Sequence, residues 1–206
     1  GIDIKSRIYD ATSFFTYIDA MNSSELAKRG HDKAKRKDLR TVGLALMVTP
    51  DYSIPVISET YPGNRSDSIQ FSVMMEQMKQ RFRDITGEEA EITIVFDRGN
   101  NSQDNLDLLE NEHLRFHYVG GLKKNQVPDL FNVSKSKYSP LECPENAPEK
   151  YANLSTYHME AQVFGRNVKT VIVYNPELEK GQIQGININT EKTKSDLLDI
   201  QGRLLK

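Results

Sequence analysis

The chain has 206 residues, and its 27 lysines and arginines against 29 aspartates and glutamates give a formal net charge of −2. This balance excludes a strongly basic nucleic-acid binder at the level of the whole chain, but it permits a local basic patch. The single cysteine, Cys143, excludes an internal disulfide, and the longest apolar run, residues 44–48, is far too short for a membrane helix. We therefore expect one large domain, or one domain with an insertion, in a reducing compartment.

The sequence first predicts three strands. β-branched and aromatic residues dominate positions 7–18, and apolar runs follow at 41–49 and 54–60. The turn at 50–53 joins the last two runs, which favours an antiparallel meander. Between the first two strands lies a polar stretch at 21–40. Its basic side chains are Lys28, Arg29, Lys33, Lys35, Arg36, Lys37 and Arg40.

The period of the apolar residues changes after the third strand. Apolar side chains recur at helical spacing from Phe71 to Ile85, which predicts a helix whose methionine-rich face packs into the core. Asp67 and Gln70 have the spacing of a capping box, so the helix should begin near Asp67. It should end before Gly87.

Strands and helices then alternate. Residues 91–97 form an apolar strand that ends on an acid, a short helix carries Leu106 and Leu109, and residues 114–119 form another strand. Such alternation implies parallel strands joined by right-handed crossovers. The sequence therefore predicts an α/β fold whose mixed sheet combines the meander with parallel strands.

The character of the chain changes near residue 123. Residues 123–150 are rich in Pro, Ser and Lys and show no clear period. The segments 156–164 and 168–174 flank a turn signal at 165–167 and predict a β-hairpin. An amphipathic helix is expected at 191–206.

We accordingly divide the chain into a core (1–123), an insertion region (124–190) and a terminal helix (191–206). The chain begins with Gly1 rather than Met and stops on the expected helix at Lys206. We therefore expect a fragment of a longer protein.

Two aspartates are the strongest functional candidates. Asp10 lies inside a strand, where Asp is disfavoured, and Asp97 lies at the carboxyl end of a buried-looking strand, where α/β sheets bind ligands. If these strands are neighbours, the two carboxylates meet and suit a hard cation such as Mg²⁺. Two simpler interpretations stay open: Asp10 faces solvent, and Asp97 caps the turn before Ser102.

The basic stretch also has two interpretations. Runs of charge are usually solvated loops. Alternatively, Lys28, Arg29, Lys33, Lys35, Arg36 and Arg40 contact a phosphate backbone beside the acidic centre.

Five segments, in order along residues 7–123, resemble the catalytic core of DDE insertion-sequence transposases, in the branch with a β-rich insertion domain. They read YDATSFF, GHDKAKRKDLRTVGLALMV, IPVISETYPGNRSD, ITIVFDRGNNSQDNLDLL and FHYVGGLK. The resemblance implies an RNase H-like fold with Asp10 and Asp97 as catalytic, metal-binding residues. It assigns supporting motif positions to Thr12, Gly63, Asn64, Asp67, Arg98 and Gly99.

The resemblance also implies two-metal cleavage and transfer of DNA strands, with two Mg²⁺ or Mn²⁺ ions roughly 3.5–4 Å apart. The implied partners are double-stranded DNA, as element ends and target, and a second subunit of the full-length protein. The implied location is the prokaryotic cytoplasm, at the nucleoid.

The sequence departs from the family at two places. His31-Asp32-Lys33 stands where Ser-Lys is usual, and the Tyr-Arg-Glu-Lys pattern that carries the third acid is absent before Lys206. We expect that acid beyond Lys206, so the fragment alone should be inactive.

Two other functions stay open. The missing third acid favours a non-catalytic DNA-binding or assembly module with the same fold. An aspartyl phosphotransferase would use Asp10 as its nucleophile, but that chemistry needs a second acid two residues on, where Thr12 stands.

Overall fold

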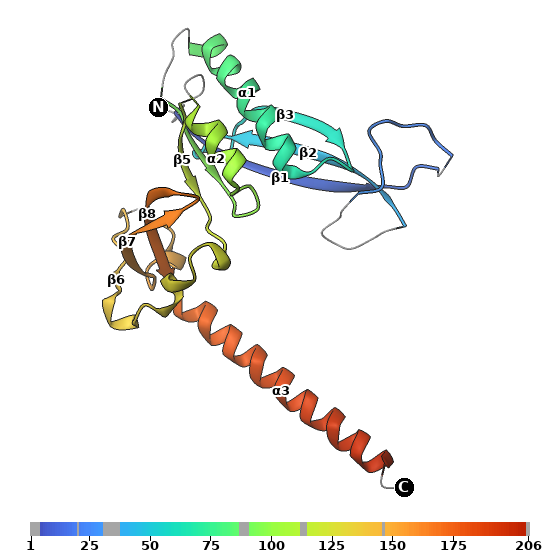
Figure 1. The fold of residues 1–206 in the computed structure, drawn as a ribbon, viewed down its shortest axis with the longest axis vertical. Coiled ribbons are helices and arrows are strands. Elements are labelled where there is room, and N and C mark those ends of the chain that lie inside the picture. Colours follow the sequence, from blue (N-terminus) through green and yellow to red (C-terminus); the bar gives the residue numbers. More distant parts are fainter. Residues whose placement is uncertain are drawn as a thin grey trace. The chain divides into compact units, whose positions relative to one another are not determined.

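The computed structural model describes residues 5–19, 21–30, 38–86, 91–111, 115–145 and 147–204. The chain divides into two units, Gly1–Lys123 and Lys124–Lys206 (Figure 1). Each unit has its own sheet, and each is described by itself.

The first unit is built on a five-stranded sheet in the order β3-β2-β1-β4-β5. β1 (Ser6–Thr16), β2 (Arg40–Val48) and β3 (Pro55–Pro62) form an antiparallel meander. β4 (Thr93–Phe96) pairs in parallel with β1, and β5 (His117–Gly120) pairs in parallel with β4. The predicted α/β class, with an RNase H-like mixed sheet, is confirmed.

The core lies between this sheet and the long helix α1 (Asp67–Thr86). Phe71 makes edge-to-face contacts with Tyr9 of β1 and Phe96 of β4, at ring-centroid distances of 5.1 and 5.2 Å. The predicted methionine face is confirmed as core, because Met74, Met75 and Met78 are fully buried. Each such side chain contributes about 1.5–3 kcal/mol by its burial. The side chain of Ile85 lies outside the described residues.

Alternation along β1 separates the core from the exposed face. Arg7, Tyr9 and Ala11 are buried, whereas Asp10 and Thr12 are exposed. Tyr9 lies on the face of the sheet that contacts Phe71. Because successive strand side chains point to opposite faces, Asp10 points to the other face.

The helix α1 begins where the sequence predicts, but its capping differs. Ser66 Oγ accepts a hydrogen bond from the backbone N–H of Ile69 at 3.4 Å. Asp67 Oδ1 instead accepts from the Tyr61 hydroxyl at 2.9 Å, and Gln70 Oε1 accepts from Arg65 at 2.9 Å. Ser66 is therefore the N-cap residue, and the expected capping box between Asp67 and Gln70 does not form.

A second helix, α2 (Gln103–Glu110), follows β4 and buries Leu106 and Leu109 as predicted. Ser102 caps it by accepting from the backbone N–H of Asn105 at 3.3 Å. The crossover returns the chain to β5 in parallel orientation, as expected for such units.

The second unit contains a three-stranded antiparallel sheet in the order β6-β7-β8. Its strands are β6 (Ser139–Pro140), β7 (Ser155–Val163) and β8 (Arg166–Tyr174). Three short 3₁₀ helices precede β6: η1 (Lys124–Gln126), η2 (Pro128–Asn132) and η3 (Lys135–Lys137). A fourth, η4 (Glu149–Tyr151), lies between β6 and β7.

The predicted hairpin exists, but its turn is shorter than expected. Only Phe164 and Gly165 connect β7 to β8, and their φ angles are 50° and 76°. Two positive φ angles are what a two-residue type I′ turn requires. Arg166 and Asn167, which the sequence places in the turn, are therefore paired strand residues.

The helix α3 (Pro176–Leu204) begins 15 residues earlier than the predicted start at 191. Asn175 caps it, because its Oδ1 accepts from the backbone N–H groups of Glu177 and Leu178 at 3.0 and 3.1 Å. Pro176 at the first helical position is pre-organised for this geometry. None of the described residues of α3 is buried.

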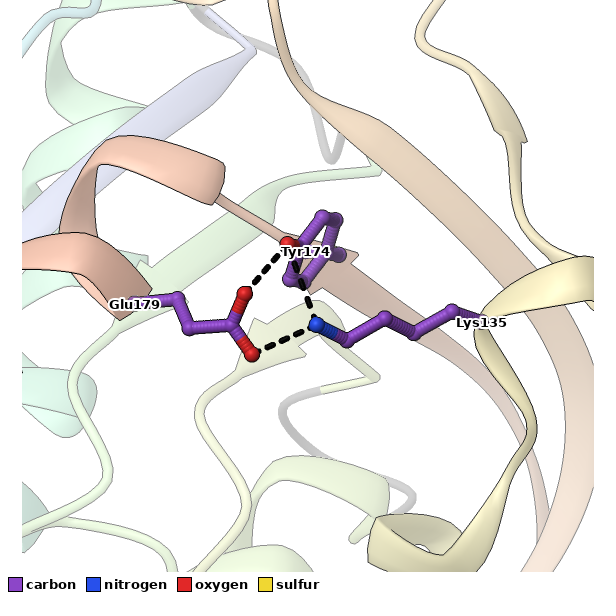
Figure 2. Close-up of polar contacts among 3 residues, drawn as sticks. All are labelled: Lys135, Tyr174 and Glu179. Carbon is purple, nitrogen blue, oxygen red and sulfur yellow. Dashed lines mark hydrogen bonds and ion pairs between the residues drawn. The ribbon is translucent and has the colours of Figure 1, made fainter. Parts of the chain in front are cut away.

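A polar cluster ties the start of α3 to its own unit (Figure 2). Glu179 accepts from Lys135 Nζ at 2.5 Å and from the Tyr174 hydroxyl at 2.6 Å. These hydrogen bonds lower the pKa of Glu179 and raise that of Lys135. The cluster therefore joins η3, the end of β8 and the first turn of α3.

Within the part of the chain that the structure describes, no helix combines the length and apolarity that crossing a membrane requires.

Candidate metal centre

The register between β1 and β4 brings the two candidate aspartates together. These parallel strands pair Tyr9 with Phe96, and the next residue in each is an aspartate. β4 ends at Phe96, whereas β1 continues to Thr16, so Asp97 follows the carboxyl end of β4 directly beside Asp10. Both aspartates are exposed.

The carboxylate of Asp97 is held at one of its two oxygens. Oδ1 accepts from the backbone N–H of Gly99 at 3.0 Å and from Asn100 Nδ2 at 2.9 Å. A Cβ on residue 99 would lie 3.1 Å from this oxygen, which is why glycine suits the position. Oδ2 accepts no hydrogen bond from the described residues. Asp97 thus caps the turn that follows β4 while one oxygen stays open.

Asp10 shows a similar division. Its Oδ1 accepts from the backbone N–H of Ala11 at 2.9 Å. Within the described part of the chain, its Oδ2 accepts no hydrogen bond. The site therefore presents two neighbouring, solvent-exposed carboxylates, each with an open oxygen.

Three buried asparagines support the loop after β4. Asn105 Nδ2 donates to the carbonyl of Asn100 at 2.7 Å, and Asn101 Nδ2 donates to the carbonyl of Gly121 at 2.8 Å. All three are at most 4% exposed. Sequence analysis missed their role, although three asparagines within residues 100–105 are a visible signal. Buried amides of this kind fix a loop because each must find a partner.

Two buried tyrosines also escaped the sequence analysis. Tyr9 is 1% exposed, and its hydroxyl has no hydrogen-bond partner among the described residues. Its pKa is raised, and burial is the largest cause. The neighbouring Tyr61 and the carboxylates of Asp67, Asp10 and Asp97 add to the shift. Burial and the bond to Asp67 also raise the pKa of Tyr61. Both phenols stay neutral beside an acidic sheet edge.

The turn after β3 lies further along the meander than the two aspartates: through β2, Pro62 is level with Phe14 of β1, whereas Asp10 is level with Ser58. Gly63 donates to the carbonyl of Leu26 at 3.1 Å, and a Cβ there would overlap the carbonyl of Thr41. Gly63 therefore permits a close backbone approach, whereas Asn64 is exposed. A small cavity of about 40 Å³ lies nearby; its lining includes Thr12, Tyr61, Gly63, Arg65 and Asp67.

The basic candidates of residues 28–40, taken together with Arg98, fall into four groups. Arg40 Nη1 donates to the carbonyls of Asn22 and Ala27 at 2.7 and 3.4 Å, so this side chain braces the loop before β2. Lys28 pairs with Thr41 through its backbone, and Arg29 is exposed. Arg98 is exposed beside Asp97. Lys33, Lys35 and Arg36 lie outside the described residues.

The donor set fits a hard divalent cation in part. Carboxylate oxygens are the ligands that Mg²⁺ and Mn²⁺ prefer, and Mg²⁺ commonly takes only one or two of them. Among the described residues, no group of three or more His, Cys, Asp or Glu side chains is placed to hold a metal ion. The described residues therefore offer two carboxylates here, Asp10 and Asp97, where the resemblance of the sequence implies three.

No protein-family model and no curated protein sequence matches this chain. The chain is similar to parts of several solved transposase structures. A Mos1 transposase paired-end complex with the left transposon end shares 12% identity over 55% of this chain and 34% of that chain, at a TM-score of 0.38. A piggyBac transposase synaptic complex with hairpin DNA shares 12% identity over 82% of this chain and 32% of that chain, at 0.41. A Mos1 strand transfer complex shares 13% identity over 62% of this chain and 39% of that chain, at a TM-score of 0.36. The chain spans about a third of the length of these proteins.

Proposed function

We propose that this chain contains the catalytic core of a DNA transposase of the DDE insertion-sequence type. The observation that carries the proposal is the β1–β4 register, which sets Asp10 beside Asp97 with an open oxygen on each carboxylate. The five ordered motifs of the sequence support it independently, because they assign catalytic roles to the same two residues.

Asp10 and Asp97 would hold Mg²⁺ or Mn²⁺. The metal ions supply charge stabilisation and an activated oxygen nucleophile for phosphoryl transfer when bound. The chain itself orients Asp97 through the backbone of Gly99 and the side chain of Asn100. A third carboxylate, outside the described residues, would complete the site.

The proposed substrate is double-stranded DNA, as element ends and target. Its phosphates would be contacted by the basic stretch before β2, in particular the exposed Arg29 and its neighbours Lys28, Lys33, Lys35 and Arg36. Arg40 is proposed to act there as the brace of the loop, since its guanidinium is committed to backbone carbonyls. The full-length protein would work as a homodimer.

Titration of this chain with Mn²⁺ tests the proposal. Wild type should show a weak site, detected as paramagnetic broadening of the amide signals of Ala11 and Gly99. Asp10→Asn or Asp97→Asn should abolish the site, because each removes half of its charge. The matched control Glu76→Gln neutralises an exposed carboxylate of α1 and should bind as wild type does. Undiminished binding in both aspartate variants would reject the metal centre.

A non-catalytic DNA-binding module is the second candidate function. The observation that favours it is that the described residues contain no three-ligand metal group. It predicts DNA binding that weakens steeply with salt but does not respond to Mg²⁺. The catalytic proposal instead predicts that Asp10→Asn and Asp97→Asn abolish strand cleavage in the full-length protein.

A further inference from the structure

We propose that Asn100 is a positioning residue that holds the Asp97 carboxylate in the orientation needed to receive a metal ion. The inference rests on the proposed function, because it gives Asn100 its role through Asp97. Asn100 directly follows the Arg98–Gly99 motif, but the motif resemblance assigns it nothing.

The hydrogen bonds of Asn100 are directed at Asp97. The side chain is 4% exposed, and its Nδ2 donates to Asp97 Oδ1 at 2.9 Å. Its own Oδ1 is buried and has no partner among the described residues. The bond to Asp97 is thus the one that its amide makes within this part of the chain.

The backbone of Asn100 is fixed from two sides. Its N–H donates to the carbonyl of Asp97 at 3.2 Å, and its carbonyl accepts from Asn105 Nδ2 at 2.7 Å. Asn105 is 1% exposed, so the support comes from inside the unit. These two hydrogen bonds therefore hold the backbone of Asn100 in place while its side-chain amide donates to Asp97.

Burying an amide with an unpaired oxygen is unfavourable, so the bond that it does make has to compensate. A hydrogen bond to a carboxylate is stronger than one between neutral groups. Together with the N–H of Gly99, it occupies Oδ1 twice and leaves Oδ2 open. Partners that orient a metal ligand in this way commonly change metal affinity by about 10–100-fold when they are removed.

Asn101 provides the matched comparison in the same loop. It is also 4% exposed and also has a buried Oδ1 without a partner in the described part of the chain. However, its Nδ2 donates to the carbonyl of Gly121 rather than to Asp97. If Asn100 served only to stabilise the loop, its replacement and that of Asn101 should have equal effects on Mn²⁺ affinity.

The test measures Mn²⁺ affinity and the side-chain conformation of Asp97 in the variants N100A and N101A. N100A should bind Mn²⁺ about tenfold more weakly than wild type, whereas N101A should stay within about twofold. In the metal-free protein, three-bond couplings should report one dominant χ1 rotamer of Asp97 in wild type and N101A, and averaged rotamers in N100A. Where N100A fails to fold, N100L fills the same volume without the donor.

Equal affinities and equal Asp97 rotamers in N100A and N101A would overturn the positioning role. A different result would overturn the proposed function, namely an Asp97→Asn variant that binds Mn²⁺ as tightly as wild type does. The metal-free rotamer measurement then still decides whether Asn100 holds the Asp97 side chain.

Discussion

The helices α1 and α3 show two different ways in which this chain supports a helix. α1 has 20 residues and buries a continuous apolar face that includes Phe71, Met74 and Met75. α3 has 29 residues and buries none of those described. Tertiary packing therefore holds α1, whereas capping by Asn175 and the cluster around Glu179 hold the start of α3. The candidate site lies in the first unit, on the strands β1 and β4 that contact α1 through Tyr9 and Phe96.

Truncation of a core side chain should have the largest effect. Phe71→Ala removes the ring that contacts both Tyr9 and Phe96 and should destabilise the first unit by about 3–5 kcal/mol. The matched change in α3, Leu197→Ala, alters a side chain that is 60% exposed and should shift stability by less than about 0.5 kcal/mol. Amide hydrogen exchange in β1 and α3 measures both. Equal losses would contradict the comparison.

Adding one methyl group should act in opposite directions in the two units. Gly185→Ala lies in α3 with no atom near the new Cβ, so it should stabilise the helix by about 1 kcal/mol. Gly43→Ala places a Cβ against the buried Tyr61 ring and should destabilise the first unit by about 1–3 kcal/mol. Thermal unfolding followed by circular dichroism measures the two signs. A stabilising Gly43→Ala would show that the sheet has room that the structure does not show.

The smallest predicted effect is the pH dependence of the α3 cluster. The pKa of Glu179 is lowered from its usual 4.5, so its stabilising effect is present above that pH and is lost as the pH falls through the lowered value. The pKa of Lys135 is raised from 10.5, so its effect is present below that pH and is lost only as the pH rises through the raised value. The protection factors of the amides in the first turn of α3, which correct for the pH dependence of intrinsic exchange, should therefore fall in acid. Glu179→Gln should remove this response, and a response that persists would assign it to another group.

The sequence predicts the elements of the first unit well because their periods are strong. The β-branched and aromatic residues of β1 predict a strand, and the 3.6-residue recurrence from Phe71 to Phe82 predicts a helix with one buried face. The predicted start of α3 was wrong by 15 residues, because the beginning of this helix has no one-sided burial. Its first turns contain Gly181 and Gly185 and bury nothing, so no apolar period marks them. The cap formed by Asn175 and Pro176 was the signal available.

The candidate site was predictable in part. The meeting of Asp10 and Asp97 was predicted on the condition that their strands are neighbours, which the family resemblance implies, and β1 and β4 do pair. The hydrogen bond from Asn100 to Asp97 and the burial of the Tyr9 hydroxyl do not follow from the sequence, because they depend on how a loop and a core pack. Spacing in the sequence carries no such information.

Anomalous X-ray scattering from crystals of this chain grown with Mn²⁺ tests the central claim most directly. The account predicts a manganese peak between the carboxylates of Asp10 and Asp97, within about 2–2.5 Å of an oxygen of each. Loss of that peak in Asp97→Asn crystals would support the assignment further. A manganese peak elsewhere, or carboxylates that lie too far apart to share one ion, would contradict the proposed metal centre.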